Sequence, residues 1–168
     1  MALKQRTAHG KHGKCARVFR VAVILTVILL CLTPCAYAAP VIYLRVYDWK
    51  TGELHAETEA QIGSKLSFGW VHSIEKIRWN EYYHVGENRD LILDAITFPA
   101  FGAGIPENKG RVNYVKDGLI HMEEIGQSFT EIVWLNSHTA TQEITLDGKH
   151  VTRGVELPQH TKLRLAVE

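Results

Sequence analysis

The sequence predicts an all-β fold: a single antiparallel β-sandwich or barrel of about ten short strands that follows an N-terminal signal segment. Two observations lead to this class. From residue 39 onward, short runs of alternating apolar and polar residues recur at intervals of about eight to twelve residues, separated by turn-forming residues. Nothing in the same region sustains a helical period.

The first half of this region contains five expected strands. Lys50-Thr51-Gly52 marks the turn after the first strand, and GENRD at 86–90 marks the turn before the fifth. The runs between the turns alternate or are rich in β-branched and aromatic residues, which favours strands. The expected ranges are 43–49, 53–60, 65–73, 78–85 and 91–98.

Two short turns organise the second half. Lys116-Asp117-Gly118 and Asp147-Gly148 each lie between alternating runs, which is the strongest short signal for a β-hairpin. Residues 99–110, PAFGAGIPENKG, form a long irregular stretch, and a loop of this kind in a compact β domain favours a functional role. The expected strands are 111–115, 119–125, 130–136, 142–146, 150–157 and 161–167.

Residues 1–38 have the features of a signal peptide. The first twenty residues hold six Lys or Arg and no acid, an apolar run covers 21–32, and Ala36 and Ala38 offer a cleavage site. Twelve apolar helical residues span only about 18 Å, short of the roughly 30 Å hydrocarbon core of a bilayer. We therefore expect an exported protein, periplasmic or extracytoplasmic, with an uncleaved anchor through 21–32 as the alternative.

Residues 39–168 are long enough for one domain with one core. All three cysteines precede residue 39, so this domain has no thiol nucleophile, disulfide or thiolate metal site. Its 13 Lys and Arg against 18 Asp and Glu give a net charge of −5. That charge argues against nucleic acid or anionic lipid as partners, and no membrane insertion of the mature domain is expected.

The stretch FGWVHSIEKIRWNEYYHV, residues 68–85, is the first that could carry chemistry. His72 shares a strand face with Trp70, which places its imidazole toward the inside of the fold. A buried imidazole needs hydrogen-bond partners, and a hairpin would bring Glu75 or Glu81 within reach. Two interpretations follow: a histidine–carboxylate site at the mouth of the sheet, or a structural histidine with charges that only stabilise the hairpin.

Metal binding and nucleophilic catalysis fit this stretch poorly. His72 and Glu75 with Glu81 and His84 supply nitrogen and oxygen donors, but no recognised metal-ligand spacing is present. Ser73 adjoins His72, and neighbouring strand residues face opposite ways, so the two cannot easily form a catalytic triad. We assign no catalytic residue and expect no metal and no cofactor.

The second stretch is the glycine loop FGAGIP, residues 101–106. It lacks the Lys-Ser/Thr ending of a phosphate-binding P-loop, and no helix signal follows it. Its glycines permit positive φ and close backbone approach, and successive N–H groups there would form an anion-binding nest. A structural β-bulge and corner explains the same glycines equally well.

Together, VHSIEKIRWNEYY and FPAFGAGIPE resemble the exported family called domain of unknown function 1850. Its members carry an HS-[VI]-E-[KR] segment, a following Glu and a later GAG-[ML]-P-type loop, and Ile105 stands here where Met or Leu is commoner. The resemblance covers roughly residues 43–167. By position the family pattern falls on His72, Ser73, Glu75, Lys76, Glu81, Gly102, Ala103, Gly104 and Pro106.

The resemblance implies a small extracytoplasmic β domain, often encoded beside tripartite (TRAP) transporters of the TAXI type, which take up organic anions. We therefore expect a non-enzymatic binding or accessory domain of such a solute uptake system. It would bind a small organic anion or a transporter component, with His72, Ser73 and the N–H groups of 102–104 as donors. The alternative is a hydrolase or metal-dependent enzyme that uses His72 with Glu75 or Glu81 as acid and base. A purely structural role for both motifs is the third hypothesis.

Overall fold

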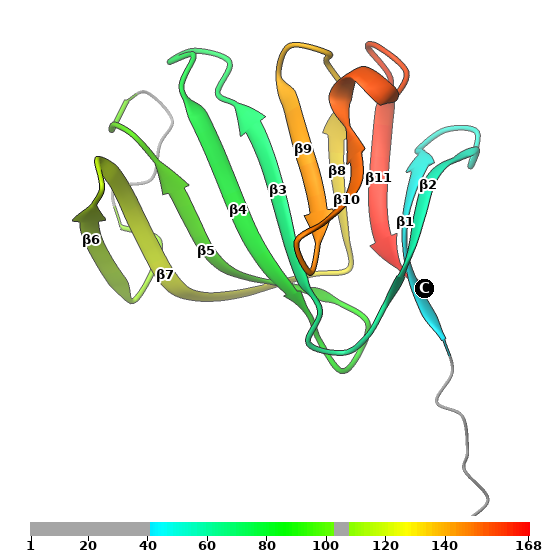
Figure 1. Ribbon diagram of the computed structural model, residues 1–168, viewed down its shortest axis with the longest axis horizontal. Helices are drawn as coiled ribbons and strands as arrows, with labels where there is room; N and C mark the ends of the chain where they lie inside the picture. The colour runs from blue at the N-terminus through cyan, green and yellow to red at the C-terminus, as the bar shows by residue number, and fades with distance from the viewer. Residues whose placement is uncertain (1–40, 103–107) are drawn as a thin grey trace, which may run out of the picture. The chain divides into compact units, whose positions relative to one another are not determined.

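Two antiparallel β-sheets make up the part of the chain that the computed structural model describes, residues 41–102 and 108–168 (Figure 1). The smaller sheet contains, in spatial order, β2 (Leu54–Ala60), β1 (Ile42–Asp48), β11 (Lys162–Val167) and β8 (Glu131–Leu135). The larger contains β10 (Lys149–Arg153), β9 (Thr141–Leu146), β3 (Lys65–Val71), β4 (Arg78–Val85), β5 (Leu91–Phe98), β7 (Leu119–Phe129) and β6 (Val112–Lys116). The predicted all-β class is confirmed, in its sandwich form, because the two sheets do not join into a closed ring.

One predicted strand is partly wrong. The expected strand 150–157 ends at Arg153, and Gly154–Glu156 form a single 3₁₀ turn, η1. The buried Asn136 holds this change of direction in place, because its Nδ2 donates to the carbonyl oxygens of Gly154 at 3.0 Å and Pro158 at 2.9 Å. Within residues 41–102 and 108–168, no helix has the length and apolar character needed to cross a bilayer.

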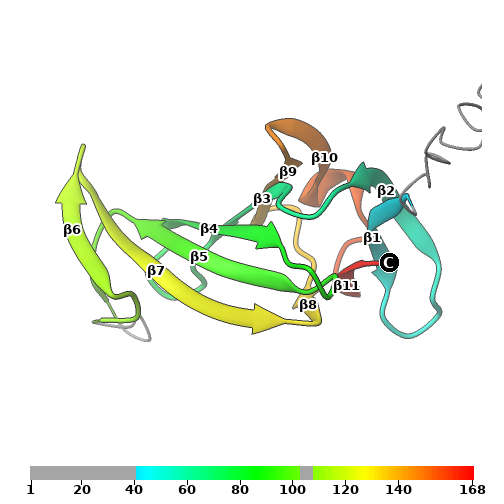
Figure 2. The same ribbon diagram turned by 90° about the horizontal axis from the view of Figure 1, so that it is seen from below.

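The two sheets are linked at a sharp corner between β7 and β8. Strand β7 runs past its expected end at residue 125 to Phe129, and β8 begins at Glu131 in the other sheet. Glu124 and Gly126 have positive φ values of 56° and 67°, and the pairing register with β5 shifts beside them. This bulge bends β7 so that it can deliver the chain to the smaller sheet (Figure 2).

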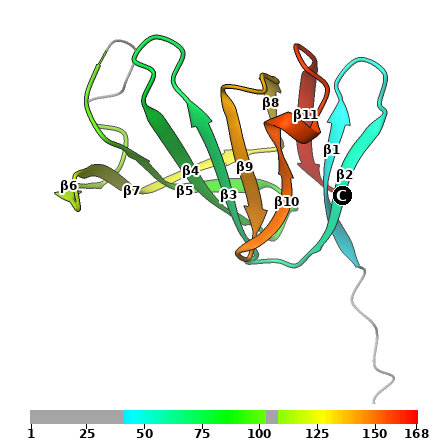
Figure 3. The same ribbon diagram turned by 45° about the horizontal axis from the view of Figure 1, so that its top comes forward.

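The core lies between the facing sides of the two sheets. Figures 1 and 3 show this layering where β8 of the smaller sheet lies behind β9 of the larger sheet. Each large apolar side chain buried there contributes about 1.5–3 kcal/mol to folding. Figure 2 shows that β6 and the start of β7 project beyond the smaller sheet, and all five residues of β6 are exposed. The side chains with almost no exposure include Leu44, Val46, Leu66, Leu91, Leu93, Ile96, Phe98, Met122, Ile144, Leu163 and Leu165.

Candidate functional site

The turn between β3 and β4, residues 72–77, is closed by hydrogen bonds to His72. The His72 N–H donates to the Ile77 oxygen, and the Lys76 N–H donates to the His72 oxygen, both at 2.9 Å. The Glu75 N–H donates to His72 Nδ1 at 3.3 Å. Because Nδ1 accepts, the neutral imidazole carries its proton on Nε2. His72 therefore fixes the shape of the turn that contains the rest of the HSIEK segment.

The imidazole of His72 belongs to an aromatic cluster and is only 8% exposed. Its ring centroid lies 5.6 Å from that of Trp70, which confirms that the two side chains share a face. Trp79 lies 6.2 Å from His72 and stacks on Phe98 at 4.8 Å, and Phe101 packs edge-on against Phe98 at 5.7 Å. Stacked and edge-on aromatic pairs of this kind add to the energy of area burial. The cluster thus connects the turn to the first residues of the glycine loop.

Glu81 is held by two ring donors. Trp79 Nε1 donates to its Oε1 at 3.2 Å, and the Tyr83 hydroxyl donates to its Oε2 at 2.7 Å. Burial of Tyr83, together with the adjacent Glu81 carboxylate, raises the pKa of the Tyr83 phenol, so this hydroxyl stays protonated and donates. The hydrogen bonds described for Glu81 run to these rings and not to His72, so its position is fixed by Trp79 and Tyr83.

The two motifs that are distant in the sequence meet at Glu75 and Gly102. A Cβ atom added to Gly102 would lie 2.6 Å from Oε1 of Glu75, much closer than any real Cβ contact. The backbone of Gly102 is therefore close against the Glu75 side chain, and any larger residue at position 102 would force that side chain to move. Figure 1 shows that the β3–β4 turn and the end of β5 lie toward the same end of the strands in the larger sheet. Ala103, Gly104 and Pro106 lie outside the described residues.

Four exposed residues lie next to this contact in the sequence, three beside Glu75 in the turn and one directly before Gly102. We call Ser73, Ile74, Lys76 and Phe101 the turn surface; Ile74 is 66% exposed and Phe101 56%. Ile74 and Phe101 were not among the predicted site residues. The sequence did contain a signal for them: each is a large apolar residue in a turn or loop, where polar residues are usual. Apolar residues beside a hydroxyl and an ammonium group form a surface suited to contact with another molecule.

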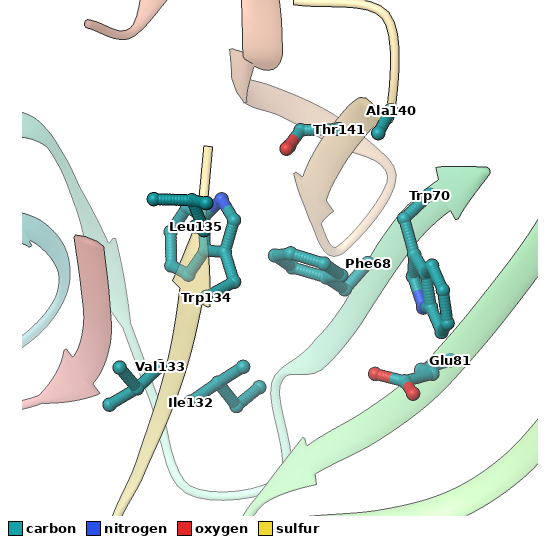
Figure 4. Close-up of a pocket in the computed structure, with 9 residues that line it drawn as sticks. All are labelled: Phe68, Trp70, Glu81, Ile132, Val133, Trp134, Leu135, Ala140 and Thr141. Atoms are coloured by element: carbon teal, nitrogen blue, oxygen red, sulfur yellow. The ribbon is translucent and has the colours of Figure 1, made fainter. Parts of the chain in front are cut away.

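A separate pocket of about 350 Å³ opens on the inner side of the same hairpin (Figure 4). It is lined by Phe68 and Trp70 of β3, Glu81 of β4, residues 132–135 of β8, and Ala140 and Thr141. Sequence reasoning missed this pocket because β8 belongs to the other sheet. The buried Nε1 of Trp134 has no hydrogen-bond partner within the described ranges, so a bound water or ligand acceptor would satisfy it.

His84 lies apart from His72. Its Nδ1 is 2.8 Å from Oδ1 of Asp94, and β4 alternation places it on the opposite face from Glu81 and Tyr83. Across the two described segments, no group of three or more His, Cys, Asp or Glu side chains is arranged to hold a metal ion.

Residues 66–152, just over half of the chain, match the model of a family described as Domain of unknown function (DUF1850). The chain belongs to the DUF1850 family. The match runs from β3 to β10, so it contains the β3–β4 turn, Gly102 and the whole lining of the pocket. The resemblance inferred from the HSIEK and GAGIP motifs is thereby confirmed. No curated protein and no solved structure matches the chain.

Proposed function

We propose that this DUF1850 chain is an exported, non-enzymatic accessory domain of a TRAP-type (TAXI) solute uptake system, and that the turn surface contacts a transporter component. The observation that carries the proposal is the contact of Glu75 with Gly102. It joins the HSIEK turn to the start of the GAGIP loop, so two separate motifs support one exposed surface. Export rests on the signal peptide expected at residues 1–38, which also gives the proposed periplasmic or extracytoplasmic location.

The positions of His72 and Glu81 favour binding over catalysis. His72 is buried and its Nδ1 accepts from within the turn, while Glu81 accepts from Trp79 and Tyr83. A hydrolase that used His72 with Glu81 would need the two groups in hydrogen-bond reach beside an open cleft. The exposed groups are instead Ile74, Phe101 and their polar neighbours, which suit a protein partner.

A small organic anion is the second candidate ligand, and Lys76 favours it. Lys76 is exposed, takes a left-handed φ of 57°, and takes part in none of the ion pairs among the described residues. Its ammonium group and the Ser73 hydroxyl would donate to a carboxylate at the same surface. The turn surface is therefore the proposed site for either ligand, the transporter component or the anion.

The test is binding of the purified full chain to the membrane subunits of a TRAP-type transporter. Ile74→Asp should weaken binding at least tenfold, because it places a charge in the apolar part of the contact. Val115→Asp is the matched control, since Val115 is similarly exposed, at 71%, but lies on β6. Equal effects of the two changes, or no binding by the unchanged chain, would contradict the transporter proposal.

The anion version is tested separately by a thermal-shift screen of the full chain with small carboxylates. A stabilising carboxylate should lose its effect in Lys76→Gln and keep it in Lys116→Gln, which removes an exposed charge from the β6–β7 hairpin. Stabilisation that survives Lys76→Gln would place the anion elsewhere. An absence of any shift, together with no transporter binding, would defeat the proposed function as a whole.

A further inference from the structure

The pocket beside β8 has aromatic walls. Phe68 and Trp134 come from opposite sheets and pack edge to face, with their ring centroids 5.2 Å apart. Trp70 lines the pocket beyond Phe68, as Figure 4 shows, and its ring lies 5.4 Å from that of Trp79. Aromatic faces carry negative charge density and attract cations within about 6 Å of the ring centroid.

Glu81 supplies the charge of this pocket. It is the one ionisable residue in the lining, and none of the ion pairs within residues 41–102 and 108–168 involves it. Its two described partners, Trp79 Nε1 and the Tyr83 hydroxyl, are neutral donors. A carboxylate can accept about four hydrogen bonds, so these two donors fix the group without neutralising it. A carboxylate thus stands at a half-buried position in a mostly aromatic and aliphatic lining, where a cationic ligand would pair with it.

We propose that this pocket binds a small organic cation, an alkylammonium with an apolar body, whose charge lies between Glu81 and the face of Trp70. The volume of about 350 Å³ is at the small end of the range for ligand pockets, which fits a compact ligand. An anion would be repelled by Glu81, and a neutral apolar compound would bury the carboxylate without a counter-charge. The site is distinct from the turn surface and does not depend on the function proposed for it.

The first test compares two ligands of the same shape on the purified full chain. Choline carries a quaternary ammonium, and 3,3-dimethylbutan-1-ol replaces its nitrogen with carbon. Titration calorimetry or the indole resonances of Trp70 and Trp134 should show choline binding at least tenfold more tightly. Equal affinities would mean an apolar pocket without charge recognition, and no binding of choline at millimolar concentration would also overturn the proposal.

The second test removes the charge. Glu81→Gln should weaken choline binding at least tenfold while leaving the weak binding of the neutral isostere unchanged. Glu59→Gln makes the same charge change on β2, away from the pocket, and should leave choline binding as it is. Unchanged choline affinity in Glu81→Gln, or equal losses in the two variants, would show that Glu81 does not recognise the ligand. If Glu81→Gln fails to fold, the ligand pair on the unchanged chain still decides the question.

Discussion

Two hairpins of the larger sheet are built in opposite ways. The β6–β7 hairpin turns at Asp117 and Gly118, whose φ values of 52° and 76° suit a tight two-residue turn, and β6 is exposed throughout. The β3–β4 hairpin has a longer turn that contains the buried His72, and it depends on Phe98 and Gly102 from outside the hairpin. The first hairpin is closed by its local turn alone, whereas the second has local hydrogen bonds and also packs against distant segments, and the candidate sites lie on the second.

The largest expected difference between the two hairpins concerns their aromatic residues. Trp79→Ala should lower the free energy of unfolding by about 3–5 kcal/mol, because it removes a buried ring that stacks on Phe98. Tyr114→Ala on β6 should cost less than about 1 kcal/mol, since Tyr114 is exposed and its two interactions among the described residues, the ring stack on His121 and the hydroxyl bond to Glu123, lie at the sheet edge. Chemical denaturation of both variants measures the difference, and similar losses would contradict the comparison.

A smaller loss of stability is expected when the hydrogen bond from Tyr83 to Glu81 is removed. Tyr83→Phe should lower the free energy of unfolding by about 1.5–3 kcal/mol, because it deletes a hydrogen bond to a carboxylate at a buried position. Tyr82→Phe is the matched control, since Tyr82 is the neighbouring exposed tyrosine on the opposite face of β4. If both changes cost the same, the Tyr83–Glu81 bond does not stabilise the fold.

The smallest effect on stability is expected in a third hairpin, β9–β10, which also has a tight turn of its own at Asp147 and Gly148. Bonds to Glu143 and then Glu156 raise the pKa of the exposed His150 above its ordinary value of 6.5. A raised folded-state pKa means that charged His150 stabilises the fold below about 6.5, and the contribution disappears as the pH rises through the raised pKa. The denaturation midpoint of the unchanged chain should therefore exceed that of His150→Gln at pH 5 and converge with it at alkaline pH. A pH-independent difference would contradict this.

The contrast between the hairpins also explains how much could be predicted from the sequence. Lys116-Asp117-Gly118 predicted the β6–β7 hairpin because a tight turn is a local property. Alternation likewise placed His72 beside Trp70. The partners of Glu81 were not predicted, because the same alternation was also compatible with a bond to His72. The pocket was not predicted either, since Trp134 reaches it from the other sheet through the β7–β8 corner.

Alanine substitutions at two glycines, one in the β6–β7 turn and one beside the β3–β4 turn, test the difference between the two hairpins. Gly118 has φ +76° with nothing within 4 Å of an added Cβ, so alanine there should cost about 1–2 kcal/mol through backbone strain alone. At Gly102 the added Cβ would meet the Glu75 side chain. Alanine at Gly102 should therefore cost stability only as long as Glu75 is present.

A double-mutant cycle on unfolding free energies measures this dependence most directly. Gly102→Ala should cost at least about 0.5 kcal/mol less in a Glu75→Ala background than in the unchanged chain. Gly118→Ala should cost the same in both backgrounds. Additive losses for Glu75→Ala and Gly102→Ala would show that the Glu75 side chain does not lie against Gly102, and the turn surface would then have no common basis.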